Sequence, residues 1–163
     1  MKSSPRLSAV AVVLAIASLG ATATADTKLS PPRGYRLWFH VNSAIVDKSS
    51  PNFATIGGFH SVYLSPGSVA MLKNERPYPD GTVYVDDVHE ATLTDGTYAE
   101  GERKATAVMV RNAKKFAATG GWGFQAWLGG DPKKPIVTDP AKQCFACHEA
   151  RKDHQYVFST YLP

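Results

Sequence analysis

The sequence predicts an α+β domain built mainly on an antiparallel β-sheet, with about five strands and two short helices. Short stretches in which apolar and polar residues alternate recur along the chain, which is the period of a strand. Gly, Pro, Asn and Asp gather between these stretches, as tight turns require. Helical signals are confined to one stretch after the second strand and one near the C-terminus.

The first half of the chain is expected to supply two strands and one helix. Residues 35–41 alternate Tyr, Leu, Phe and Val with Arg, Trp and His, and residues 60–64 form a second short strand. A Ser-, Pro-, Asn- and Gly-rich stretch between them is typical of a loop. Ser65 is placed to cap the helix, Pro66 occupies its first position, and the helix should end near Asn74.

The second half is expected to supply three strands and the C-terminal helix. Asp95 and Gly96 form a turn, and Gly120 and Gly121 break the chain before the last strand. A proline-rich connection then leads to Pro140, which opens the C-terminal helix. The three strands are expected at residues 82–93, 104–111 and 122–128.

The C-terminal helix carries the most informative motif of the chain. Residues 144–148 have the pattern C-x-x-C-H, the attachment sequence for a c-type haem. Cys144 and Cys147 stand one helical turn apart, so each thiol can add to a vinyl group of one porphyrin. His148 then follows as an axial ligand of the iron. The motif therefore predicts one covalently attached haem c per chain.

Two other readings of the motif remain open. A zinc half-site would normally need a second ligand pair, but the chain has only these 2 cysteines, and His154 alone stands near them. A thioredoxin-like dithiol is expected after a strand, early in a βαβ pattern, whereas this motif lies near the C-terminus without such a pattern.

The N-terminus has the features of a secretory signal. Lys2 and Arg6 precede a short apolar run, and small residues at 23–25 form a cleavage site. We therefore expect a signal peptide at residues 1–25, a single haem domain at 26–163, and a periplasmic protein. A retained anchor is the less favoured alternative, because the apolar run is too short to span a bilayer. The net charge of +4 comes without a basic tract, so nucleic acid is not indicated as a partner.

An ordered set of stretches gives the chain a family resemblance. They read Gly-Tyr-Arg-Leu-Trp (34–38), His-Ser-Val-Tyr-Leu-Ser-Pro (60–66), Tyr-Pro-Asp-Gly-Thr-Val (78–83), Gly-Gly-Trp-Gly-Phe (120–124), the C-x-x-C-H motif, and Tyr-Val-Phe-Ser (156–159). The chain resembles the cytochrome P-460 family, which includes the β-sheet cytochromes c′ (cytochrome c′-beta). The resemblance implies a homodimer with one c-type haem per subunit, His148 as the proximal ligand, and a distal pocket formed by the sheet.

The resemblance also points to further candidate site residues. Hydroxylamine-oxidising members carry a lysine linked to the haem edge, and Asp86 occupies the nearest matching place here, with Lys73 and Lys104 as possible substitutes. The cytochrome c′-beta branch lacks that link and places phenylalanines over the open iron face. Phe53 and Phe59 are candidates for this distal role, although packing alone also accounts for them. Asp86 is equally compatible with a solvated strand position.

Three functions follow as hypotheses. The first is a protein with five-coordinate iron on His148 that binds small neutral ligands such as nitric oxide in an apolar pocket. The second is an enzyme that oxidises hydroxylamine or a related nitrogen compound, with Asp86 as a proton relay. The third is a six-coordinate electron carrier that uses Met71 or Met109. The three strand histidines, His40, His60 and His89, are interpreted as surface or structural residues.

Overall fold

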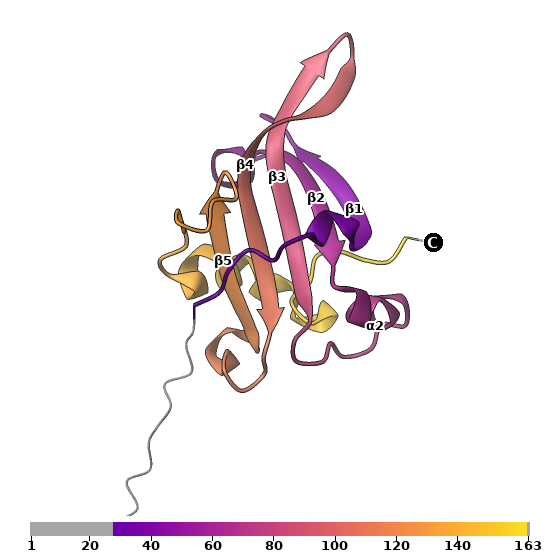
Figure 1. The fold of residues 1–163 in the computed structure, drawn as a ribbon, viewed down its shortest axis with the longest axis vertical. Coiled ribbons are helices and arrows are strands. Elements are labelled where there is room, and N and C mark those ends of the chain that lie inside the picture. Colours follow the sequence, from indigo (N-terminus) through magenta and orange to yellow (C-terminus); the bar gives the residue numbers. More distant parts are fainter. Residues whose placement is uncertain (1–27, 163) are drawn as a thin grey trace, which may run out of the picture.

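The computed structural model describes residues 28–162 and builds them around one five-stranded antiparallel sheet (Figure 1). The strands lie side by side in the order in which they occur along the chain. The expected signal peptide at residues 1–25 lies outside the described residues. The strands are β1 (Phe39–Val46), β2 (Gly58–Leu64), β3 (Val83–Thr94), β4 (Thr97–Arg111) and β5 (Trp122–Leu128).

Two helical segments accompany the sheet, so the predicted α+β class is confirmed. The first combines η2 (Pro66–Ser68) with α2 (Val69–Lys73). The second combines η4 (Ala141–Phe145), α3 (Ala146–His148) and η5 (Glu149–His154), and we call it the C-terminal segment. Three single turns complete the elements: η1 (Tyr35–Leu37), α1 (Phe53–Ile56) and η3 (Ala117–Thr119). Within residues 28–162, no helix is both long and apolar enough to cross a membrane.

The start of the first strand differs from the prediction. Residues 35–37 form η1 instead of strand, and β1 begins at Phe39. Gly34 adopts φ 69°, a left-handed conformation that starts this turn, and the amide of Trp38 closes it by donating to the Tyr35 carbonyl (2.9 Å). Tyr35 and Trp38 then pack against the sheet together. The alternation of residues 35–41 thus arises because some of these side chains contact the sheet. A turn packed on a sheet can produce the same alternation as a strand.

The first helix begins where the sequence predicts, with Pro66 in its first turn. Ser65 precedes it, but its hydroxyl does not cap the helix. The Ser65 Oγ instead accepts a hydrogen bond from the Val83 amide (3.1 Å) and so joins the helix to β3. The loop predicted before β2 contains the short α1.

Strands β3 and β4 form a hairpin that extends past the rest of the sheet (Figure 1). Asp95 has φ 49° and Gly96 has φ 77°, so both turn residues are left-handed, as a two-residue hairpin turn requires. This turn pairs Thr94 directly with Thr97, and β4 therefore begins seven residues before the predicted start at residue 104.

The two faces of the sheet are covered by different parts of the chain. Residues 28–38 cross one face and the C-terminal segment lies behind the other (Figure 1). The first face buries Val85, Val108 and Trp127 under residues 29–38, and we call it the sealed face. The second face packs Tyr84 and Phe124, among others, against the C-terminal segment, and we call it the motif face. Strand alternation divides neighbouring residues between the two faces.

Candidate functional site

The C-x-x-C-H motif lies on the C-terminal segment against the motif face. Cys144 lies within the wide turn of η4, and Cys147 and His148 follow on α3. The side-chain amide of Gln143 orders the entry to this segment, because its oxygen accepts the backbone amides of residues 138 and 139 (2.7 Å each). Both thiols are free; Cys144 is half-buried and Cys147 is exposed. Burial raises the pKa of the Cys144 thiol to about 11.

His148 is prepared to act as a metal ligand through one ring nitrogen. Its Nδ1–H donates to the Tyr156 carbonyl oxygen (2.7 Å), which leaves Nε2 as the nitrogen with a free lone pair. The left-handed residues Gln155 (φ 57°) and Tyr156 (φ 67°) turn the chain back so that this carbonyl reaches the ring. Phe124 and Phe158 flank the imidazole, each with its ring centroid 5.0 Å away.

The surroundings of His148 keep the imidazole neutral. Burial lowers its pKa below the usual value, and this effect outweighs the Tyr156 hydrogen bond and the negative charge of Asp86, which both act in the opposite direction. A neutral imidazole is the form that binds a metal. The charge effect also shows that Asp86 and His148 are electrostatic neighbours.

Small side chains lie beside Asp86 on the motif face. Asp86 pairs across the strands with Val62 and with Ala107, and Ala107 in turn pairs with Ala126. Ala105 lies two residues from Ala107 on the same face. We call Ala105, Ala107 and Ala126 the alanine patch. All three are only partly buried, although Ala105 and Ala107 lie on the inner strand β4 and Ala126 on the adjacent β5. A flat apolar group can therefore approach the backbone closely here.

Asp86 forms a hydrogen-bonded pair with His60 from the adjacent strand. His60 Nδ1 lies 2.8 Å from Asp86 Oδ2, and His60 Nε2 lies 2.6 Å from the Ile56 carbonyl oxygen. Burial alone would lower the pKa of His60, but the hydrogen bond and charge of Asp86 raise it above the usual value. The other carboxylate oxygen, Asp86 Oδ1, is buried and makes no hydrogen bond with the described residues.

Sequence reasoning interpreted His60 as structural and missed this pair. His60 and Asp86 are 26 positions apart, and only the pairing of β2 with β3 brings them together. A usable signal was present, because a histidine and an aspartate occurred on neighbouring predicted strands. The register that makes them neighbours on one face was not contained in the strand patterns.

The two candidate phenylalanines are not brought to Asp86 and His148. Phe53 lies on α1 and lines a cleft of about 450 Å³ that also includes Leu93 and Tyr98 of the hairpin. Phe59 is the direct neighbour of His60 on β2 and therefore faces the opposite side of the sheet. Their distal role remains a hypothesis that this placement does not support.

The lysines and methionines considered for the site have other surroundings. Lys104 Nζ donates to the Gly57 carbonyl, next to the carbonyl that His60 engages. Lys73 Nζ lies 5.0 Å from the centre of the Tyr161 ring. Met109 is buried in the core of the motif face, and Met71 packs against that core.

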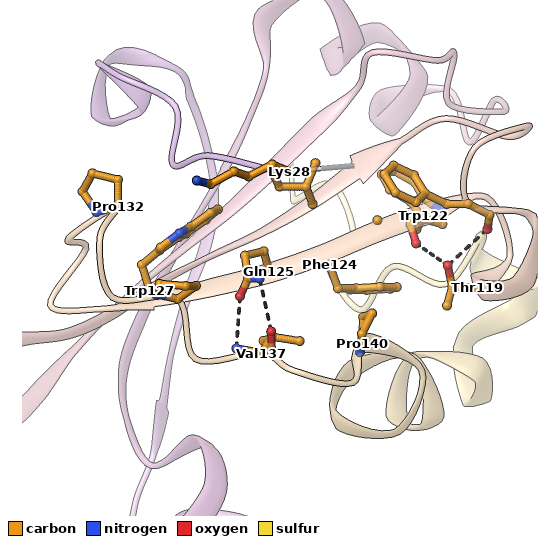
Figure 2. A pocket seen from close by; sticks show the side chains of 13 residues that line it. Lys28, Thr119, Trp122, Phe124, Gln125, Trp127, Pro132, Val137 and Pro140 are labelled. Carbon is orange, nitrogen blue, oxygen red and sulfur yellow. Dashed lines mark hydrogen bonds between the residues drawn. The ribbon is translucent and has the colours of Figure 1, made fainter. Parts of the chain in front are cut away.

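A separate groove of about 540 Å³ runs along β5 (Figure 2). Trp122, Phe124, Trp127 and Pro140 are among the residues that line it. Gln125 joins its floor to the following loop by exchanging hydrogen bonds with Val137 (3.0 and 3.2 Å; Figure 2). The groove shares Phe124 with the surroundings of His148 but includes neither Cys144 nor His148 in its lining.

The residues at the motif fit a c-type haem. Two free thiols stand one helical turn apart, the adjacent histidine presents Nε2, and the facing sheet carries small apolar side chains. Within residues 28–162, no three His, Cys, Asp or Glu side chains gather in a way that could hold a metal ion. The zinc alternative therefore gains no support from the described residues.

Comparison with known proteins identifies the family. The family model for Cytochrome P460 matches residues 32–159, which is most of the chain and includes every strand and the motif. No curated protein matches the chain. Because the match spans the whole sheet and the C-terminal segment, the family resemblance noted in the sequence is confirmed, and it implies a haem cofactor. This chain belongs to the cytochrome P460 family.

Proposed function

We propose that the chain is an exported c-type monohaem protein that binds a small neutral ligand, such as nitric oxide, at an open iron position. In this proposal Cys144 and Cys147 attach the haem and His148 is the axial ligand. The observation that carries the proposal is the hydrogen bond from His148 Nδ1 to the Tyr156 carbonyl, which leaves Nε2 free. A bound haem would supply an iron centre with an exchangeable coordination position.

The chain's own residues have separate tasks in this proposal. The Tyr156 carbonyl fixes the orientation and tautomer of the His148 ring. Phe124 and Phe158 pack against the imidazole and limit the movement of its ring. The alanine patch gives a flat group room against the sheet, since larger side chains there would occupy that space.

The side chains near the alanine patch favour an open position over a sixth protein ligand. His60 uses both ring nitrogens in hydrogen bonds, so neither has a lone pair directed at a metal. Met109 is buried in the core, with Tyr84 and Phe124 in the same cluster. Alanine side chains offer no donor atom. These contacts support the ligand-binding function over the six-coordinate electron carrier.

Oxidation of hydroxylamine or a related nitrogen compound is the second candidate function, with electrons passing to an external acceptor. The observation that favours it is the Asp86 carboxylate, which is partly exposed, lies beside Ala107 of the alanine patch and acts through its charge on His148. A carboxylate in this position can accept the protons that such an oxidation releases. The site expected from the sequence to be apolar is therefore accompanied by a charged side chain, Asp86.

The ligand assignment is tested with His148→Ala in the exported protein. We expect the wild type to carry the mass of one haem that resists acid–acetone extraction, with a five-coordinate high-spin ferrous spectrum. The variant should lose the resonance Raman iron–histidine band, because its proximal imidazole is gone. His154→Ala, which changes an exposed histidine of the same segment, is the matched control. A retained iron–histidine band in His148→Ala would exclude this ligand.

The second function is tested by hydroxylamine turnover with an artificial electron acceptor. Under the ligand-binding function we expect no steady turnover and no lysine joined to the haem peptide in mass-spectrometric mapping. Turnover that Asp86→Asn abolishes, and that Asp95→Asn at the hairpin tip retains, would favour the enzyme instead. A haem peptide joined to the fragment that contains Lys104 would also overturn the ligand-binding proposal.

A further inference from the structure

The Tyr156 carbonyl oxygen is presented to His148 by a turn with an unfavourable backbone. Gln155 has φ 57° and ψ 34°, and Tyr156 has φ 67°, so two successive residues other than glycine adopt the left-handed region. Residues with a Cβ atom rarely adopt this region, and they keep it only where surrounding contacts hold them. The turn places the Tyr156 carbonyl oxygen 2.7 Å from His148 Nδ1. The contacts that hold the turn therefore also determine this hydrogen bond.

The side-chain amide of Gln155 joins the turn to a segment that lies 77 positions earlier in the chain. Its Oε1 accepts from the Tyr78 amide (2.8 Å), and its Nε2 donates to the Arg76 carbonyl (3.0 Å). Pro77 between them has a fixed φ, and Arg76 is biased towards an extended backbone because it precedes a proline. The segment thus presents one donor and one acceptor in fixed positions. A side-chain amide offers the matching acceptor and donor on separate atoms.

Trp122 holds the backbone of the same turn from β5. Its Nε1–H donates to the Gln155 carbonyl oxygen (2.9 Å), and its side chain is almost completely buried. Tyr78, whose amide donates to the Gln155 side chain, packs its ring against Trp122 with 5.8 Å between the ring centres. The turn is therefore fixed at two points by residues that also contact each other.

The side chain and the amide of Tyr156 are held as well. An added Cβ at Gly120 would lie 2.5 Å from the Tyr156 ring, so this glycine leaves the space that the ring occupies. The same ring packs against Phe145, with 5.4 Å between the ring centres. The Tyr156 amide donates to the Arg151 carbonyl (2.7 Å). Together these contacts restrict movement of the Tyr156 carbonyl relative to His148.

The hydrogen bond at Nδ1 affects a metal bound at Nε2 of the same ring. When Nδ1–H donates to a carbonyl, electron density shifts into the imidazole, and Nε2 becomes a stronger electron donor. The effect depends on a short and well-aligned hydrogen bond. A stronger donor favours ferric over ferrous iron and lowers the reduction potential. The position of the Tyr156 carbonyl is therefore linked to the properties of an iron held by His148.

We propose that Gln155 is a positioning residue which, together with Trp122, holds the Tyr156 carbonyl against His148 and so sets the electron-donating strength of the axial ligand and the reduction potential of the haem iron. The inference rests on the proposed function, because it takes His148 as the axial ligand. It requires no contact between Gln155 and the haem or its ligand.

Gln155→Asn tests this role without adding backbone strain. Asparagine tolerates left-handed φ, but its shorter side chain cannot reach both Arg76 and Tyr78. In the ferrous haem-loaded protein we expect the resonance Raman iron–histidine band to move down by several wavenumbers, because a displaced carbonyl weakens the hydrogen bond. The reduction potential should rise for the same reason. Trp122→Phe, which removes one donor and keeps an aromatic ring, should shift both quantities in the same direction.

Gln125→Asn is the matched control. Gln125 also joins a loop to the sheet through its side-chain amide, with hydrogen bonds of 3.0 and 3.2 Å to Val137, and neither bond involves the turn at residues 155–156. We expect this variant to lose stability and to keep the iron–histidine band and the reduction potential of the wild type. Equal shifts in Gln125→Asn and Gln155→Asn would show that both quantities follow a general loosening of the fold, and the inference would be wrong.

The outcomes separate this inference from the proposed function. An unchanged band and potential in both Gln155→Asn and Trp122→Phe would refute the inference, whatever ligands the wild type binds. A six-coordinate wild-type iron would lack the band and refute the open position, while the potentials of the variants would still decide the inference. A wild type that binds neither carbon monoxide nor nitric oxide would refute the function alone. Thermal unfolding confirms that each variant is folded, and Trp122→Phe carries the test if Gln155→Asn is not.

Discussion

Asp86 and Asp87 are adjacent in the chain, yet the two faces of the sheet give them different environments. Asp87 on the sealed face is 0% exposed and accepts hydrogen bonds from both Arg36 and Arg103 (2.7 Å each). Asp86 on the motif face is 33% exposed in its side chain; among residues 28–162 it is hydrogen-bonded to His60, and its Oδ1 has no partner there. A fully paired buried carboxylate supports the fold, whereas an incompletely paired one indicates a site.

The apolar residues of the two faces differ in the same way. On the sealed face, Val85, Val108 and Trp127 are almost completely buried by residues 29–38. On the motif face, the alanine patch remains partly accessible at the same level of the sheet. The motif face also has a buried core around Tyr84 and Phe124, so the difference between the faces is confined to the alanine patch. Variants can test whether this division separates stability from function.

The largest expected effect is the loss of the Asp87 carboxylate. Asp87→Ala leaves two arginines without their buried partner, and we expect the free energy of unfolding to fall by about 3 kcal/mol. The arginines are partly exposed, which places this value at the lower end for a buried pair. Asp86→Ala should cost less than about 1 kcal/mol. Urea unfolding of the haem-loaded protein measures both.

Asp95→Asn at the exposed hairpin turn is the control for this comparison, because asparagine tolerates the left-handed φ of this position. If Asp86→Ala destabilised the protein as much as Asp87→Ala, the two aspartates would have the same structural role. The distinction between a supporting face and a site face would then be wrong.

The second expected effect is that a change of side-chain size lowers haem content on the motif face and stability on the sealed face. Ala107→Leu fills the alanine patch, so we expect the haem content per chain to fall several-fold while the chain stays folded. Val108→Ala, one residue further on the sealed face, should instead cost about 2 kcal/mol of stability and retain the haem. Intact mass gives the haem content, and urea unfolding gives the stability. Normal haem content in Ala107→Leu would contradict a haem position against this patch.

The smallest expected effect is a difference in pH dependence. The raised pKa of His60 means that its contribution to stability is complete below the unfolded value of about 6.5 and is lost as the pH rises through the folded pKa. Burial opposes ionisation of Asp87, but its two arginines outweigh burial and lower its pKa. The Asp87 contribution is therefore present above about pH 3.9 and is lost as the pH falls through the folded pKa.

The His60 contribution is isolated by comparing wild type with His60→Gln across pH 5 to 9. Their difference in unfolding free energy should shrink as the pH rises above about 6.5. A difference that grows with rising pH would show that His60 is neutral in the folded protein.

Local patterns were enough to predict much of the architecture. Strands β2 and β5 lie within two residues of their predicted bounds, because their alternating side chains coincide with buried and accessible positions. The strand predicted at residues 35–41 was partly wrong, since contact with a neighbouring layer can produce alternation in a turn as well as in a strand. Strand β4 was predicted too short because its charged start gives no apolar pattern, and its pairing with β3 supplies the missing support.

By itself, the sequence determined the chemistry that short spacing can encode. Two thiols and a histidine within five residues specify a haem-attachment motif, and turn residues with left-handed φ specify the hairpin. Only the tertiary structure decided the partners of His60, Asp86 and Asp87, because strand register places residues far apart in the chain on one face. It also turned Phe59 away from that face and brought the Tyr156 carbonyl to His148. The local sequence specifies the spacing of residues within a motif or a turn. Hydrogen-bond partners and burial depend on contacts that form only when the whole sheet is assembled.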